Sequence, residues 1–339
     1  MNHRLLGRTG VKVSPLCLGT MMFGAWGNKD HDDSIRIIQR ALDAGINFID
    51  TADAYAAGES EEIVGKAISG RRDNVVLATK VHAGMGADVN QRGNSRRWIM
   101  SEVESSLKRL NTDWIDLYQM HRADPNTDID ETLRALDDLI TQGKIRYAGS
   151  STFPAAEIVE AQWCAREHHF ARFVTEQPPY SILTRHVEAD VLPVCKRHHM
   201  GVLTWSPLAG GWLSGKWRRN STPNDSHRAG RTPQRFDLSS EGNQRRLDAA
   251  DALATLAEEN GLSLVHMAIA FVLRHPAVTC AIIGPRTMEQ LETQLGADSV
   301  TLSDAILDKI DEIVPPGVTL VPSDISWTNP ALKADARRR

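Results

Sequence analysis

Short runs of apolar and β-branched residues recur along the chain, and most of them contain few polar residues. Strands that are buried on both faces have this pattern, which is typical of a parallel sheet covered by helices. The pattern predicts eight strands, at Pro15–Thr20, Asn47–Thr51, Val75–Lys80, Ile115–His121, Tyr147–Ser151, Phe173–Gln177, Val202–Ser206 and Ala281–Gly284.

Segments between these runs repeat apolar residues at the spacing of a helix. Ser95 is expected to cap a helix that extends to Leu110, because a serine at this position accepts a backbone hydrogen bond. Pro154 is expected in the first turn of a later helix, where its missing N–H costs nothing. Further helices are predicted over residues 33–44, from Asp128, and over residues 241–259 and 262–274. Alternation of strand and helix, repeated in this way, predicts an α/β fold of the (β/α)8 TIM-barrel type.

A doubly wound sheet uses the same alternation and is the structural alternative. It requires a glycine-rich phosphate-binding turn after an early strand, whereas residues 21–24 read Met-Met-Phe-Gly. No linker of biased composition divides the chain, so residues 1–339 are expected to form a single domain. We expect a hairpin within residues 1–13 and an irregular tail from about residue 316. The polar segment 212–236 has the length of a functional or disordered loop.

The formal net charge is −4 over 339 residues, and lysine and arginine are interspersed with acidic residues. The composition therefore gives no reason to expect a nucleic-acid partner. No apolar stretch of about 18 residues occurs, so neither a membrane span nor a membrane partner is expected. The four cysteines form no C-x-x-C pair and residues 1–10 do not resemble a signal peptide, which together favour a cytoplasmic location. The pattern does not define an oligomeric state.

Two motifs resemble ligand sites but lack a residue that the ligand requires. Residues 210–216 read G-x-x-x-x-G-K, as in a nucleotide-binding loop, but Trp217 stands where a serine or threonine must bind Mg²⁺. The pairs at residues 168–169 and 198–199 are adjacent histidines in predicted helices, where neighbouring side chains point apart. Neither pair has a second ligand four residues away, so no metal site is predicted.

Candidate catalytic residues stand at the carboxyl ends of consecutive predicted strands, where the active site of a TIM barrel lies. Asp50, Lys80 and His121 each end a strand, and Tyr55 follows in the loop after Asp50. Alternation along a strand places Asp50 on the face of Phe48, so these ionisable side chains are expected to converge at one end of the barrel.

The chemistry of such a cluster is that of a proton donor. A phenol has a pKa near ~10, and an ammonium within ~4–6 Å lowers it. Asp50 would keep the ammonium of Lys80 charged in a partly buried site. A neutral His121 imidazole can donate a hydrogen bond to a carbonyl oxygen or relay a proton. We therefore expect Tyr55 to act as a general acid in carbonyl reduction, and because no side chain delivers hydride, a nicotinamide cofactor must supply it.

Several phrases of the sequence occur in the same order in a known family. They are Phe48–Tyr55, Gly58–Glu62, Gly65–Ala67, Leu77–Lys80, Ser106–Leu110, Trp114–His121, Gly143–Ser151, Trp205–Gly211 and Ile283–Thr287. On these phrases the chain resembles the aldo-keto reductase family along nearly its whole length, in the branch of bacterial-type enzymes similar to potassium-channel β-subunits. The resemblance implies that Asp50, Tyr55, Lys80 and His121 are the catalytic tetrad of an oxidoreductase. It also implies reversible reduction of small aldehydes and ketones to alcohols.

The resemblance further implies NADPH as cofactor, with NADH as a weaker alternative, because Arg286 can clamp a ribose 2′-phosphate through its planar fork. Ser151 and Gln294 depart from the asparagine that is common in the family at these places. The implied cofactor-binding residues are Gly19, Thr20, Met21, Asp50, Ser150, Ser151, Gln177, Trp205, Ser206, Leu208, Gly210, Lys216, Gly284, Arg286, Gln290 and Gln294.

The substrate pocket is expected to come from loops. Its candidate residues are Met22, Trp26, His82 and Trp212, and their largely apolar character favours an apolar or aromatic carbonyl compound. Two other functions use the same scaffold. One is a cofactor-binding regulatory subunit with little turnover, as in the potassium-channel β-subunits. The other is a different TIM-barrel enzyme, such as a phosphate-sugar isomerase, which needs no nicotinamide.

Overall fold

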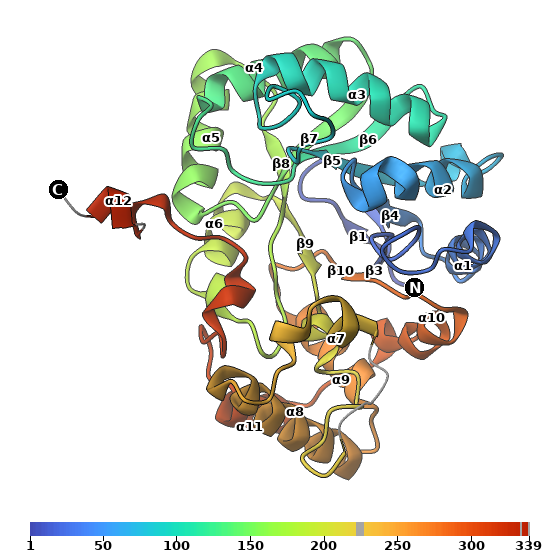
Figure 1. Cartoon of the computed structure of the whole chain (residues 1–339), viewed down its shortest axis with the longest axis vertical. Coiled ribbons are helices and arrows are strands. Elements are labelled where there is room, and N and C mark those ends of the chain that lie inside the picture. The colour runs from blue at the N-terminus through green and yellow to red at the C-terminus, as the bar shows by residue number, and fades with distance from the viewer. Residues whose placement is uncertain (222–226, 333, 338–339) are drawn as a thin grey trace.

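Eight parallel strands close into a barrel in the computed structural model, which describes residues 1–221, 227–332 and 334–337 (Figure 1). The order around the barrel is β10-β3-β4-β5-β6-β7-β8-β9, so each strand pairs with its neighbour in sequence and the last pairs with the first. The predicted (β/α)8 fold is confirmed, and every predicted strand is present. The strands are β3 (Leu16–Gly19), β4 (Phe48–Asp50), β5 (Val76–Val81), β6 (Ile115–Met120), β7 (Ile145–Ser151), β8 (Phe173–Gln177), β9 (Gly201–Trp205) and β10 (Cys280–Ile283).

Helices surround the barrel and bury their apolar faces against it (Figure 1). Ser95 caps α3 by accepting a hydrogen bond from the Trp98 amide, as its position in the sequence predicts. Pro154 is the cap residue itself, one position before the expected first turn. The helices are α1 (His31–Asp43), α2 (Glu59–Ala67), α3 (Arg96–Leu110), α4 (Ile129–Thr141), α5 (Ala155–His168), α6 (Val191–His198), α7 (His227–Arg231), α8 (Glu241–Glu259), α9 (Leu264–Arg274), α10 (Met288–Gln294), α11 (Asp304–Ile313) and α12 (Ala334–Arg337).

The expected hairpin covers the amino-terminal end of the barrel. Its strands β1 (Arg4–Leu5) and β2 (Lys12–Val13) pair antiparallel. Gly7 in its turn has φ +57, and a Cβ there would lie 2.8 Å from the Gly201 nitrogen at the start of β9. The interior of the barrel is filled by a second apolar cluster: Leu6, Val13, Cys17, Phe48, Ala78, Leu117, Leu203, Cys280 and Ile282. The amino-terminal end is therefore closed, and only the carboxyl ends of the strands are left for a site.

The C-terminal tail is irregular in its first part, as expected, and runs along the loop that follows β8. Arg185 donates its amide to Val318 and Leu320 donates to Leu183. A short 3-10 helix, η7 (Pro322–Ile325), comes next, and the last described residues form α12, which projects away from the barrel (Figure 1).

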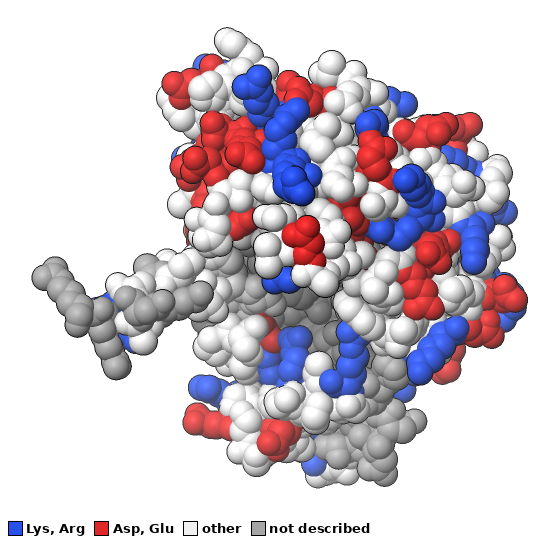
Figure 2. Space-filling view, turned by 45° about the horizontal axis from the view of Figure 1, so that its top comes forward, with Lys and Arg blue, Asp and Glu red and all other residues white. Residues whose placement is uncertain are grey.

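Charges of both signs are spread over the face that Figure 2 shows, around a hollow near its middle. Within the described part of the chain, no single helix is long and apolar enough to span a membrane. The α8–α9 pair reaches that length and composition only when taken together, and the two helices meet at 96°.

Candidate active site

Lys80 occupies the centre of a buried cluster at the carboxyl ends of β4 and β5. Its Nζ donates to Asp50 Oδ2 at 2.5 Å, to the Thr51 carbonyl at 2.8 Å and to the Tyr55 hydroxyl at 3.4 Å. An ammonium has three N–H groups, so each of them has an acceptor. The Lys80 side chain has no exposed surface, and a charge buried this deeply needs such partners.

Asp50 is held from its other side by two amides. Asp50 Oδ1 accepts from Gln177 Nε2 at 2.8 Å and from Gln119 Nε2 at 3.2 Å. Hydrogen bonds to a carboxylate favour its charged form and fix its orientation. The strand pattern explains why these residues meet, because side chains at alternate positions of neighbouring strands point into the barrel. Asp50, Gln119 and Gln177 therefore form a polar layer above the apolar interior.

Tyr55 begins a short 3-10 turn, η1 (Tyr55–Gly58), in the loop after β4. Its ring lies 5.9 Å from the His121 ring in an edge-on arrangement and 6.1 Å from the Trp26 ring. The turn contains two alanines with positive φ and Gly58 at φ +96. A Cβ on Gly58 would lie 2.6 Å from the Arg109 side chain, which packs closely against the turn at this position. Strained backbone of this kind persists where the surrounding structure holds it, and here it sets the position of the tyrosine.

Burial controls the protonation of the two aromatic groups. It raises the pKa of Tyr55 above the usual 10.0, and although Lys80 acts in the expected downward direction, it does not outweigh burial. Burial also holds the pKa of His121 well below 6.5, and the positive charges of Lys80 and Arg122 lower it further. At neutral pH the site therefore holds a protonated phenol and a neutral imidazole. Burial opposes the charge on Lys80, but attraction to Asp50 and Tyr55 raises the pKa of Lys80 overall.

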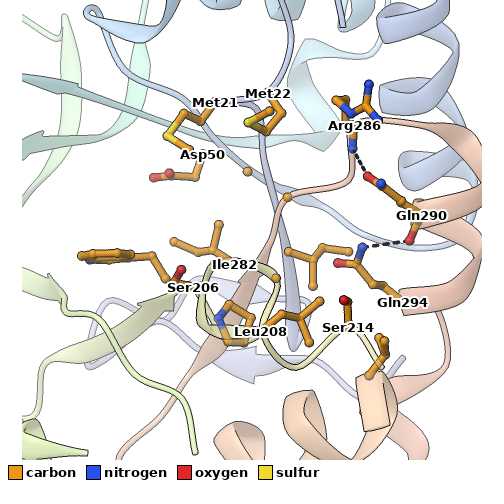
Figure 3. A pocket seen from close by; sticks show the side chains of 18 of the residues that line it. Met21, Met22, Asp50, Ser206, Leu208, Ser214, Ile282, Arg286, Gln290 and Gln294 are labelled. Carbon is orange, nitrogen blue, oxygen red and sulfur yellow. Dashed lines mark hydrogen bonds between the residues drawn. The ribbon is translucent and has the colours of Figure 1, made fainter. Parts of the chain in front are cut away.

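A cavity of about 600 Å³ extends from this cluster to α10 (Figure 3). Asp50 and Met21 lie at one end, and Arg286, Gln290 and Gln294 lie at the other. The residues expected to bind a cofactor that line this cavity are Gly19, Met21, Asp50, Ser151, Gln177, Trp205, Ser206, Leu208, Gly210, Lys216, Gly284, Arg286, Gln290 and Gln294.

Thr20 and Ser150 belong to the same expected set but do not line the cavity. Thr20 Oγ1 lies 2.9 Å from Ser60 Oγ in a buried contact between the loop after β3 and α2. Ser150 donates its hydroxyl to Glu176 Oε2 at 2.5 Å. Strand alternation explains the second case, since Ser151 points into the barrel and its neighbour must point out.

The residues expected to line a substrate pocket differ in where the structure places them. Met22 lines the cavity, and Trp26 lies beside Tyr55 under the Arg231 guanidinium, 4.5 Å from its ring. His82 does not line the cavity and is hydrogen-bonded to Asn94 at 2.9 Å. Trp212 is also absent from the lining: it is buried, with its ring 4.5 Å from Trp217. Its large apolar ring packs among other aromatic side chains of the same loop instead of facing a substrate.

Several cavity residues were not expected from the sequence. Arg122 follows His121 directly, so its place at a strand end was the available signal. Glu289 and Thr293 share a helical face with Gln290 and could have been found by extending the spacing of that face. Trp217 and Arg235 come from the segment 212–236, and no local pattern shows that these two side chains reach the cavity.

The loop after β9 and the start of α10 have features that suit a nucleotide. Ser206, Ala209, Gly210 and Gly211 all have positive φ, a cluster of unusual backbone next to the cavity. At the far end, Gln290 accepts from the Arg286 amide at 2.8 Å and Gln294 donates to the Gln290 carbonyl at 2.8 Å (Figure 3). Gln294 Oε1 is buried and has no partner in the described part of the chain, so it is an acceptor suited to an amino group of a ligand.

The chain belongs to the Aldo/keto reductase family, whose model matches residues 15–315, and this membership makes it an oxidoreductase. Members of this family generally depend on NAD(P)H. Family membership leaves the isomerase alternative without support.

Individual relatives cover almost the whole chain. The "Uncharacterized oxidoreductase YrpG" of Bacillus subtilis (strain 168) is 42% identical over 96% of this chain and 100% of its own length. A "Probable voltage-gated potassium channel subunit beta" of Arabidopsis thaliana is 36% identical over 93% of this chain and 97% of its own. The "Aldo-keto reductase YhdN" of Bacillus subtilis (strain 168) is 38% identical over 86% of this chain and 87% of its own.

Within the described residues, no group of three or more histidine, cysteine, aspartate or glutamate side chains is placed to hold a metal ion. The four cysteines are free thiols.

Proposed function

We propose that this protein reduces aldehydes and ketones to alcohols with NADPH, reversibly, with Tyr55 as the general acid. The observation that carries the proposal is the coordination of the Lys80 ammonium, which lies between the Asp50 carboxylate and the Tyr55 hydroxyl. A phenol at 3.4 Å from a fixed cation can donate its proton to an oxygen that becomes negative, because the cation stabilises the phenolate that remains.

Each member of the tetrad has a separate task. The neutral His121 donates a hydrogen bond to the carbonyl oxygen and so orients it toward Tyr55. Asp50 keeps Lys80 charged, and Lys80 stabilises the phenolate. A nicotinamide cofactor, when bound, supplies the hydride. Trp205 offers a face on which an aromatic ring can stack, and Ser151 and Gln177 are placed to hold a carboxamide.

The far end of the cavity supports NADPH as the cofactor. Arg286 lines the cavity at the start of α10, where its guanidinium can bind a 2′-phosphate with two parallel hydrogen bonds. The buried acceptor of Gln294 fits the amino group of an adenine. Titration with NADPH and NADH, followed by tryptophan fluorescence, is expected to show tighter binding of NADPH. Equal affinity for the two would remove the role given to Arg286.

The reaction itself is tested by following NADPH absorbance with a panel of aldehydes and ketones. Tyr55→Phe is expected to lower kcat for reduction by at least about 100-fold, the contribution of a general acid, while NADPH affinity changes little. Tyr147→Phe is the matched control, because Tyr147 packs against the apolar interior of the barrel and should keep normal activity. Full activity of Tyr55→Phe would refute the assignment of the acid.

A regulatory subunit that binds the cofactor with little turnover is the second candidate, because a relative at 36% identity is named as a potassium channel subunit beta. Negligible turnover on every carbonyl compound, together with tight NADPH binding, would favour it.

A cytoplasmic location and a small-molecule partner remain part of the proposal, and the free thiols are consistent with a reducing compartment.

A further inference from the structure

Cationic side chains along the cavity differ in whether an acidic partner neutralises them. Arg235 forms an ion pair with Asp324 at 2.5 Å. Arg122, Lys216 and Arg286 also line the cavity, and none of them has a carboxylate within ion-pair distance among the described residues. The proposed cofactor accounts for two of these, because Arg286 is proposed to bind its 2′-phosphate and Lys216 is among the residues expected to bind it. Arg122 lies at the catalytic end and is left without an anion.

Arg122 is held in place by its backbone and by one hydrogen bond of its side chain. It follows His121 at the end of β6, and its Nη1 donates to the His121 carbonyl at 2.5 Å. Its own carbonyl accepts from Asn94 Nδ2 at 2.9 Å, which ties it to the loop before α3. A guanidinium has five N–H donors, so most of those of Arg122 are unused by the described residues.

Burial makes this arrangement costly. Burial lowers the pKa of Arg122, and the opposing influences are Tyr55 and Glu176. Glu176 lies outside the barrel interior, where it accepts from Ser150 and the Phe153 amide, and it forms no ion pair with Arg122. Arg122 is half-buried, and a cation that is partly removed from water without an ion-pair partner gains from a ligand that provides the counter-charge.

We propose that Arg122 binds an anionic group, a carboxylate or a phosphate, carried by the carbonyl substrate. The proposal rests on the proposed function, because it places the carbonyl at Tyr55 and His121, next to which Arg122 lies. The substrate class is then small aldehydes or ketones with an anionic substituent. Met21 and Met22 line the same end and contact the carbon skeleton between the two polar groups. This differs from the apolar substrate that the loop residues alone suggest.

The test compares substrates that carry an anionic group with neutral counterparts that lack it. Initial rates are measured for 4-oxobutanoate against 4-oxobutanamide, and for glyceraldehyde 3-phosphate against glyceraldehyde, with saturating NADPH. The natural chain is expected to prefer at least one anionic member by about tenfold or more in kcat/KM, the range of a charge-assisted hydrogen bond. The two pairs distinguish carboxylate from phosphate as the favoured anion.

Arg122→Gln is expected to abolish the preference by raising KM for the anionic substrate, while the neutral substrate changes by less than about threefold. Arg122→Lys should restore part of the preference, since it keeps the charge but not the planar fork. Arg166→Gln is the matched control: it removes an exposed cation from α5, away from the cavity, and should leave the ratio of anionic to neutral substrate unchanged.

The outcomes separate the two proposals. Reduction of neutral carbonyls with no preference for an anionic one, or an unchanged preference in Arg122→Gln, overturns the role of Arg122 and leaves the proposed function intact. Reduction of none of the four compounds overturns the role of Arg122, and the wider carbonyl panel then decides whether the proposed function fails as well. Loss of activity toward anionic and neutral substrates alike in Arg122→Gln, with folding retained by circular dichroism, also contradicts anion recognition.

Discussion

At the scale of single residues, the question is which side chains point into the site. Alternation along three strands was enough to predict that Asp50, Lys80 and His121 would point to one end of the barrel, and they do. The same reasoning could not find Arg122, because alternation places neighbouring residues on opposite faces, whereas both His121 and Arg122 line the cavity just beyond the end of β6. It also could not show that Trp212 packs inward, since its partners in packing lie up to 24 residues away in an irregular loop.

Glu176 on β8 gives a prediction at this scale. The side chain is fully buried, and burial raises its pKa to about 7. A carboxyl whose pKa is higher in the folded state stabilises the fold at low pH, and this stabilisation is lost as pH rises through about 7. Glu176→Gln should therefore unfold with less pH dependence than the natural chain between about pH 5 and pH 8.

The measurement is the free energy of unfolding of each variant at several pH values across this range. The difference in unfolding free energy between the two ends should shrink by up to roughly 3 kcal/mol, the equivalent of the pKa shift. Glu167→Gln, on the exposed side of α5, is the control and should behave like the natural chain. Parallel pH profiles for Glu176→Gln and the natural chain would show that Glu176 ionises as freely in the folded protein as in the unfolded one.

At the scale of elements, η7 in the C-terminal tail is joined by ion pairs to Arg235 and to Arg246 on α8. Asp324 in η7 accepts from Arg235 at 2.5 Å and from Arg246 Nε at 3.2 Å, and we call these three residues the tail latch. Asp324 and Arg246 are both buried, and Arg235 lines the cavity. The tail, which lies far from the barrel strands in sequence, therefore fixes a wall of the proposed cofactor site.

Asp324→Asn tests the tail latch. Removing one charge leaves Arg246 buried without its partner, so the free energy of unfolding is expected to fall by about 3 kcal/mol. Because Arg235 is released as well, the Kd for NADPH should rise several-fold. Both quantities are available from one set of thermal-shift and fluorescence titrations.

Glu312→Gln is the matched control for this test. It breaks the exposed ion pair with Lys309, which should cost less than about 1 kcal/mol and leave the Kd for NADPH unchanged. A loss of stability in Asp324→Asn with an unaltered Kd would restrict the tail latch to a role in folding.

At the scale of the whole molecule, the sequence predicts the fold more directly than it predicts the site, because buried strands have a recognisable apolar pattern. Strands covered on both faces are mostly apolar, so Val202–Ser206 and Ala281–Gly284 were recognisable from their own sequence without knowledge of their neighbours. The covering of the cavity was not, because Trp217 and Arg235 reach it through long-range packing. Sequence patterns report local burial, whereas the walls of the cavity depend on segments that meet only in the folded chain.

The coordination of Lys80 has a consequence for how Tyr55 becomes ready for another cycle. All three N–H groups of the ammonium are engaged, and its raised pKa keeps them attached. Lys80 therefore acts as a permanent positive charge and not as a proton shuttle. In the proposed mechanism the tyrosinate is therefore reprotonated after each turnover from the cavity side, through His121 or solvent, and access of water to that side would set the rate of this step.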